Sequence, residues 1–282
     1  MKFGANTWIW LAPVTVDAIK SLAPNLAQAG FDLIELPLET IGGFNYGEAA
    51  VIIEDYGLGV STCVAIGPDR DLIHPDATIR DNGMAYVHQA IEAASALGAV
   101  NLIGPLYSAV GRTWQATPAE RARDLDLLVN QLGTLSNYAA DYGVILCLEP
   151  LNRFETSFIN LASQAIEVID RVNSPACKIL LDTFHMNIEE PSLGDAIRAT
   201  GQRLGHFHAC ENDRGVPGSG HVPWQDVAAA LKDIQYAGPV VIESFTAEVQ
   251  SIAAAAAIWR PLATTQDAIA YDGLTFLKSL LT

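Results

Sequence analysis

Residues 144–151 read VILCLEPL, an apolar run interrupted only by Glu149 near its end. Seven other short runs of similar composition are spaced along the chain. They are KFGANTW from Lys2, DLIELPL from Asp32, GVSTCVAI from Gly59, AVNLIGPL from Ala99, CKILLDTF from Cys177, LGHFHAC from Leu204 and PVVIESF from Pro239. Strands that are apolar at consecutive positions bury both faces, which is typical of a parallel sheet covered by helices.

The stretches between these runs have helical patterns. Residues 77–97 repeat apolar side chains at a spacing that suits one helix face, and residues 118–142 follow the cap signature TPAE at 117–120. Shorter helices are expected near 161–172, 192–201, 224–236 and 267–281, and residues 246–266 predict an Ala-rich helix followed by an irregular connection.

Eight strand–helix units in 282 residues predict a single (β/α)8 TIM barrel, and no linker divides residues 1–282 into more than one domain. The alternative is an open doubly wound sheet. It is disfavoured because the chain has no G-x-G-x-x-G after the first strand and no G-x-x-x-x-G-K-[ST] motif.

The formal net charge of −16, with only 16 scattered Lys and Arg residues, argues against nucleic acid as a partner. We find no secretory signal, and the most apolar late stretch, SIAAAAAIW, is too short for a membrane span. A soluble, cytoplasmic protein is therefore expected. The four cysteines are far apart and form no C-x-x-C pair, which predicts buried, reduced thiols.

Four consecutive strand candidates end on a group that can bind a metal: Glu149 in LCLEP, Asp182 in ILLD, His208 in HFH and Glu243 in VVIE. An isolated buried carboxylate costs several kcal/mol, and the few cations nearby cannot neutralise all three. Three oxygen ligands and one imidazole suit Mn²⁺, Mg²⁺ or Co²⁺ better than a structural Zn²⁺ site. The alternative is a hydrogen-bonded polar layer at the barrel mouth.

Several motifs together resemble those of the ketose 3-epimerases, the D-tagatose and D-psicose (allulose) 3-epimerase relatives within the xylose-isomerase-like TIM barrels. The motifs are LNRFET after Glu149, LDTFHMNIEE from Leu181, GHFHACENDRGVPGSGHVPW from Gly205 and VVIESF from Val240. The resemblance extends from the first strand to the C-terminus and is densest over residues 144–245.

This resemblance implies an isomerase that acts on a free ketose, with one divalent metal ion and a homodimeric or homotetrameric assembly. It implies that Glu149, Asp182, His208 and Glu243 hold the metal, that Glu149 and Glu243 are also the acid and base, and that Glu155, His185 and Arg214 hold the sugar's oxygens.

Epimerisation of a ketose at C3 requires removal of a weakly acidic proton next to the C2 carbonyl, through a cis-enediolate. The negative charge that develops calls for electrostatic stabilisation by a divalent cation, and Arg214 or His185 can add to it. Inversion also requires a base on one face of C3 and an acid on the other, roles that Glu149 and Glu243 can exchange.

Other polar or aromatic residues have less specific interpretations. His206 lies two residues before His208 and is expected deeper in the barrel, in a supporting role. Cys210 is expected to be a thiol near the mouth, and Glu211 is a candidate for supporting the site. For Trp114, a substrate-binding role and a packing role are both open, as they are for three further aromatic residues, Trp8, Trp10 and Phe245.

Other functions fit the same barrel. One alternative is an aldose–ketose or hydroxypyruvate-type isomerase, or an inosose dehydratase. A DNA-repair endonuclease is disfavoured, because it would need a basic groove and more than the six histidines present. A barrel without catalysis predicts a disrupted pair of glutamates, yet both glutamates are present.

Overall fold

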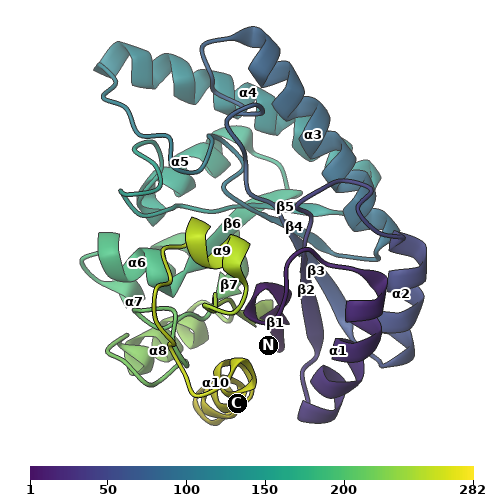
Figure 1. Cartoon of the computed structure of the whole chain (residues 1–282). Coiled ribbons are helices and arrows are strands. Elements are labelled where there is room, and N and C mark those ends of the chain that lie inside the picture. The colour runs from purple at the N-terminus through teal and green to yellow at the C-terminus, as the bar shows by residue number, and fades with distance from the viewer.

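Eight parallel strands close into a barrel in which each strand lies beside its neighbours in sequence (Figure 1). The computed structural model describes residues 1–282. The strands are β1 (Lys2–Asn6), β2 (Leu33–Pro37), β3 (Gly59–Cys63), β4 (Asn101–Gly104), β5 (Ile145–Leu148), β6 (Cys177–Asp182), β7 (Leu204–His208) and β8 (Pro239–Ile242). The barrel closes where β8 pairs with β1, from Lys2 opposite Pro239 to Ala5 opposite Ile242. The predicted (β/α)8 fold is confirmed.

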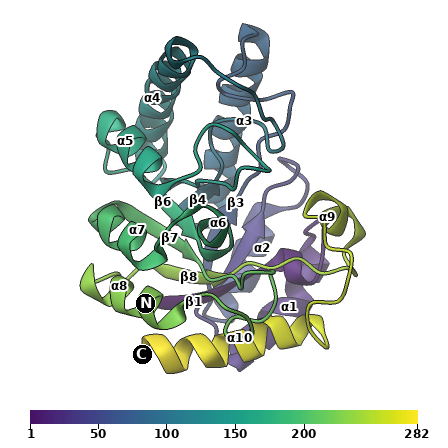
Figure 2. The ribbon, with the colours of Figure 1, turned by 90° about the vertical axis from the view of Figure 1, so that its left-hand side faces the viewer.

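Helices surround the barrel (Figure 2). The first eight connect consecutive strands, and the last two follow β8. The helices are α1 (Val16–Ala29), α2 (Tyr46–Asp55), α3 (Ala77–Ala96), α4 (Pro118–Asp141), α5 (Ala162–Val172), α6 (Thr183–Glu189), α7 (Leu193–Thr200), α8 (Trp224–Asp233), α9 (Gln250–Ala255) and α10 (Gln266–Leu281), with 3-10 turns η1 (Thr7–Ile9) and η2 (Gly201–Arg203). The six helices whose ranges were predicted separately are present within a few residues of those ranges.

Local sequence fixes where the helices begin. The Thr117 hydroxyl accepts a hydrogen bond from the Glu120 amide, and the Glu120 carboxylate accepts one from the Thr117 amide, which forms the predicted capping box of α4. Helix α6 was not predicted separately. It begins directly after β6, because the Asp182 carboxylate accepts a hydrogen bond from the Phe184 amide, 2.8 Å away.

The barrel has an apolar exterior and a partly polar interior. A core of 65 buried residues packs the outward faces of the strands against the helices. Inside the barrel, a separate apolar cluster contains only Cys63, Ile103, Cys147 and Leu180. Buried polar side chains occupy much of the remaining interior: Asn6, Glu35, Ser61, Asn101 and His206. The interior therefore offers hydrogen-bonding partners directly beneath the mouth.

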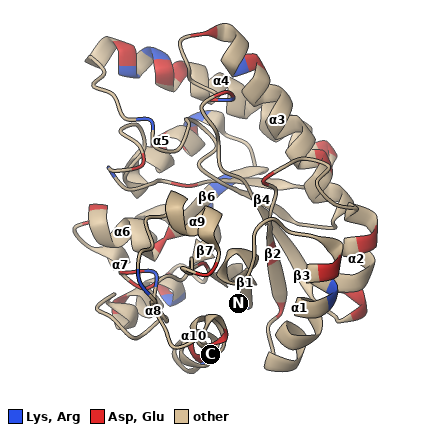
Figure 3. Cartoon of the chain, viewed as in Figure 1, with Lys and Arg blue, Asp and Glu red and all other residues tan.

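The distribution of charge agrees with the sequence. Figure 3 shows that Lys and Arg are spread over separate elements, among more numerous Asp and Glu residues. None of the helices combines the length and hydrophobicity that crossing a bilayer requires. All four cysteines are buried and free of disulfide bonds, as predicted.

Gly104 ends β4 in a conformation that other residues rarely adopt, with φ of +132°, and a Cβ there would lie 2.2 Å from the Val64 carbonyl oxygen. We expect Gly104→Ala to lower the free energy of unfolding by about 2–4 kcal/mol, because the new Cβ both strains the backbone and collides with Val64, which directly follows β3. Gly98→Ala is the control: φ is +69° and no atom lies within 4 Å of the added Cβ, so about 1 kcal/mol is expected. Chemical denaturation measures the free energy of unfolding of both variants. Equal losses in Gly104→Ala and Gly98→Ala would contradict the collision.

Candidate active site

The four predicted strand-end residues meet at one mouth of the barrel. Asp182 and His208 are the last residues of β6 and β7, and Glu149 and Glu243 directly follow β5 and β8. All four are buried. Potential ligand atoms of Glu149, Asp182 and His208 lie within 4.8 Å of one another, as do those of Asp182, Cys210 and Glu243. The barrel thus gathers the predicted carboxylates and imidazole around Asp182.

One nitrogen of His208 faces these carboxylates without a hydrogen bond. Its Nδ1 atom is buried and unpartnered, 3.5 Å from Glu243 Oε2 and 3.9 Å from Asp182 Oδ2. The other nitrogen, Nε2, lies 2.9 Å from Glu35 Oε1. Since an ionised carboxylate can only accept, Nε2 carries a proton, and Nδ1 is the nitrogen that can take either a second proton or a metal ion.

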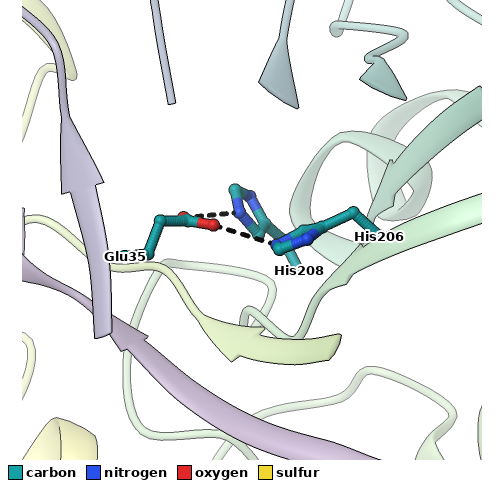
Figure 4. A group of neighbouring side chains, drawn as sticks. All are labelled: Glu35, His206 and His208. Carbon is teal, nitrogen blue, oxygen red and sulfur yellow. Dashed lines mark hydrogen bonds and ion pairs between the residues drawn. The ribbon is translucent and has the colours of Figure 1, made fainter. Parts of the chain in front are cut away.

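Glu35 lies deeper in the barrel and connects both histidines of β7 (Figure 4). Its Oε2 atom is 2.9 Å from His206 Nε2. It also accepts hydrogen bonds from Asn6 Nδ2 at 2.9 Å and from the Ser61 hydroxyl at 3.0 Å. Burial alone would raise the pKa of Glu35, but His208 and His206 lower it below its usual range. Glu35 is therefore a fixed anion behind His208.

Arg214 bridges the carboxylates from the loop after β7. Its Nη1 atom donates to Asp182 Oδ2 and to Glu243 Oε2, both at 2.7 Å. Its guanidinium lies over the rings of Phe184 and Phe245, 4.2 and 4.8 Å from their centroids. The Arg214 backbone is left-handed, with φ of 66°, which is uncommon for a residue other than glycine. The loop therefore holds this guanidinium in a strained but well-supported position.

The carboxylates repel one another. Burial, followed by the charges of Glu243 and Asp182, raises the pKa of Glu149 well above its usual range. Burial also favours the neutral form of Asp182, but Arg214 and the neighbouring histidines lower the pKa of Asp182 below its usual range. For His208, burial lowers the pKa, yet the carboxylates of Glu243 and Glu35 outweigh burial and raise it. The cluster favours additional positive charge.

The cluster opens into a cavity of about 320 Å³. Its lining includes Glu149, Glu243, Arg214, His185 and Glu155, together with the aromatic rings of Trp8, Phe184 and Phe245 and the side chains of Glu39 and Arg70. The first five of these residues were predicted from the sequence as site residues, and a substrate-binding role was left open for Trp8 and Phe245. Polar groups converging within aromatic walls are typical of a small-molecule site.

His185 and Glu155 are held by one asparagine. Asn152 donates from its backbone to His185 Nδ1 at 3.1 Å, and from its side chain to Glu155 Oε1 at 2.7 Å. His185 Nε2 then lies 3.8 Å from Glu149 Oε1 and 3.3 Å from Arg214 Nη2. Burial lowers the pKa of His185, which favours the neutral imidazole.

Some candidates lie elsewhere or have another role. Trp114 is not in the lining of this cavity; it stacks on Phe158, with centroids 5.8 Å apart and an angle of 18° between the rings. Glu211 organises the loop after β7: its carboxylate accepts from the amides of residues 212, 218 and 222 and from Trp224 Nε1. Cys210 is buried, and its thiol lies 3.0 Å from the Glu243 carbonyl oxygen.

Glu35 and Arg70 were not predicted as site residues. Glu35 is a carboxylate inside the apolar run DLIELPL, which is the same kind of signal that marked Glu149. However, three further apolar residues follow Glu35, so the pattern does not place it at a strand end. Arg70 is in a loop, where an arginine has no distinguishing pattern.

Comparison with known proteins identifies similar chains. The D-psicose 3-epimerase of Agrobacterium fabrum is 34% identical over 88% of this chain and 86% of its own length. The L-ribulose 3-epimerase of Methylomonas sp. is 31% identical over 99% and 97%. The crystal structure of a D-allulose 3-epimerase from Methylomonas sp. in complex with D-allulose superposes with a TM-score of 0.93, at 30% identity, covering 99% of this chain and 97% of that one.

These relatives are epimerases that act on sugars, so the prediction of an isomerase is confirmed. Residues 24–280 match the sequence profile described as xylose isomerase-like TIM barrel. The chain belongs to the xylose isomerase-like TIM barrel family.

Proposed function

We propose that this protein is a metal-dependent ketose 3-epimerase that inverts C3 of a free ketose. The observation that carries the proposal is that Glu149 and Glu243 line one cavity, beside Asp182 and His208. Sequence relatives named as D-psicose, L-ribulose and ketose 3-epimerases support the reaction type.

Glu149, Asp182, His208 and Glu243 would hold a divalent ion. With all three carboxylates ionised, the one guanidinium leaves two negative charges uncompensated around His208. The buried Nδ1 atom of His208 has no hydrogen-bond partner. This donor set suits Mn²⁺ best among the candidates, with Mg²⁺ or Co²⁺ as alternatives. When bound, such an ion stabilises the negative charge that develops on the substrate.

Glu149 and Glu243 would transfer the protons. They follow β5 and β8, which are three strands apart around the barrel, so their side chains approach a sugar from different sides. One carboxylate removes the C3 proton and the other, as its carboxylic acid, returns a proton to the opposite face. Exchange of these two roles makes the reaction reversible.

Other residues of the cavity would orient the sugar. Arg214 and His185 offer donors beside the two glutamates, and Glu155 offers an acceptor that Asn152 holds in place. The rings of Trp8 and Phe245, with centroids 5.7 Å apart, offer apolar surface for the C–H face of the sugar. We also propose a homodimer or homotetramer in the cytoplasm, by analogy with the family.

The proposal is tested by supplying the Mn²⁺-loaded protein with fructose, psicose, tagatose, sorbose, ribulose and xylulose and separating the products. We expect the C3 epimer in each productive case, and loss of turnover after treatment with a chelator, restored by Mn²⁺. An aldose product would instead indicate an aldose–ketose isomerase. Reaction of phosphorylated sugars alone would refute the free-ketose assignment.

Replacement of either proton-transfer group should stop the chemistry. We expect Glu149→Gln and Glu243→Gln each to lower kcat by at least about 10³-fold, because an amide can neither remove nor return the C3 proton. Exchange of that proton with D₂O, followed by NMR, is the measurement. Glu48→Gln, at an exposed ion pair with Lys20, is the control. Undiminished exchange in both active-site variants would rule out the two-glutamate scheme.

Glu35 should influence metal binding through His208. Its contact with Nε2 fixes the tautomer and ring orientation of His208, so Glu35→Gln is expected to weaken Mn²⁺ binding by about 10- to 100-fold. Titration followed by electron paramagnetic resonance measures this affinity. Ser61→Ala, which removes a contact to Glu35 but not to His208, should change it far less. A variant that is less stable but binds Mn²⁺ normally would indicate a purely structural role.

A further inference from the structure

Two arginines line the cavity, and they differ in how they are paired. Arg214 is 2.7 Å from both Asp182 and Glu243. Arg70 takes part in no ion pair, and its Nε atom is buried without a hydrogen-bond partner. Its one contact with an acceptor, from Nη2 to the Ala65 carbonyl oxygen, is 3.5 Å long. Most of the five donors of this guanidinium are therefore free.

Arg70 lies on the opposite side of the mouth from His208. It follows β3, which is four strands around the eight-stranded barrel from β7 and its terminal His208. A substrate whose C2 and C3 lie among Glu149, Glu243 and Arg214 would thus extend its remaining carbons towards the β3 side of the cavity.

The backbone around Arg70 is held firmly. Its amide donates to the Gly67 carbonyl at 3.1 Å, and the next-but-one amide, of Leu72, donates to the Tyr107 carbonyl at 3.0 Å. Helix α3 packs so closely that a Cβ at Gly83 would lie 2.3 Å from the Arg70 carbonyl oxygen. The side chain therefore projects from a fixed point.

The guanidinium is also oriented by an aromatic ring. It lies over Tyr86, 3.9 Å from the ring centroid, and the Tyr86 hydroxyl donates to the Leu38 carbonyl at 3.0 Å. A buried donor without a partner costs about 1–3 kcal/mol. The guanidinium of Arg70 is already oriented at the edge of the cavity. A ligand oxygen that accepts a hydrogen bond from its Nε atom would therefore recover this cost.

We propose that Arg70 binds the hydroxyl groups at the end of the ketose remote from C2 and C3, and thereby favours six-carbon ketoses over shorter ones. The inference rests on the proposed function. A guanidinium would bind a terminal phosphate by the same donors, but the lining also carries the carboxylates of Glu39, Glu149, Glu155 and Glu243. Their negative charge favours neutral hydroxyl groups over a phosphate dianion.

Arg70→Met retains the apolar stem of the side chain but removes the hydrogen-bond donors. The test compares this variant with the wild-type enzyme on D-psicose, D-ribulose and L-erythrulose. We expect the KM for psicose to rise by about 10- to 100-fold, as for lost charged hydrogen bonds. The kcat for psicose should be nearly unchanged, and kcat/KM for the four-carbon erythrulose should not change. Arg70→Lys should recover part of the loss. Arg153→Met, at an ion pair outside the cavity lining, is the control.

Equal losses on all three ketoses would overturn the proposal, as would no loss on any of them. A wild-type preference for fructose 6-phosphate that Arg70→Met abolishes would overturn it in favour of a phosphate site. A wild-type enzyme that epimerises none of the ketoses would refute the proposed function instead. Calorimetric binding of the same sugars would then still test the role of Arg70, since it requires no turnover.

Discussion

The burial of three carboxylates side by side is the constraint on which the candidate site depends. Glu149, Asp182 and Glu243 all lie at the barrel mouth with little solvent to screen them, and the pKa of Glu149 is raised as a result. Arg214 relieves part of the repulsion by bridging the other two carboxylates. The fold tolerates this arrangement because 65 other buried residues form an apolar core around the barrel.

A polar interior layer extends this electrostatic arrangement below the mouth. Glu35 contacts both His206 and His208, and Asn101 Nδ2 lies 3.2 Å from His206 Nδ1. Because the apolar cluster inside the barrel has only four members, this layer makes up a large part of the interior. The orientation of His208 at the site is thus tied to Glu35 on β2, the strand opposite β6 and its terminal Asp182 in the barrel.

Sequence patterns predicted the elements well where local signals were strong. Helix α4 begins at its TPAE cap, and the eight apolar runs each contain a strand. The sequence could not distinguish two features of Asp182: it caps α6, and it also lies in the cluster of side chains that could hold a metal. The case of Trp114 is similar. Its position near β4 left pocket and packing roles open, and the stacking partner Phe158 comes from a distant loop.

The sequence by itself determined the parallel barrel and the four strand-end residues that meet at its mouth, because a carboxylate or imidazole after an apolar run is conspicuous at any strand end. It could not determine the role of Glu35, since an apolar run that is buried on both faces does not reveal which residues face the interior. Only closure of the barrel brings Glu35 of β2 within 2.9 Å of His208 of β7, a residue 173 positions away in sequence. The same closure sets Arg70 across the mouth from His208, because the order of strands around the barrel, rather than any local pattern, fixes which loops face each other.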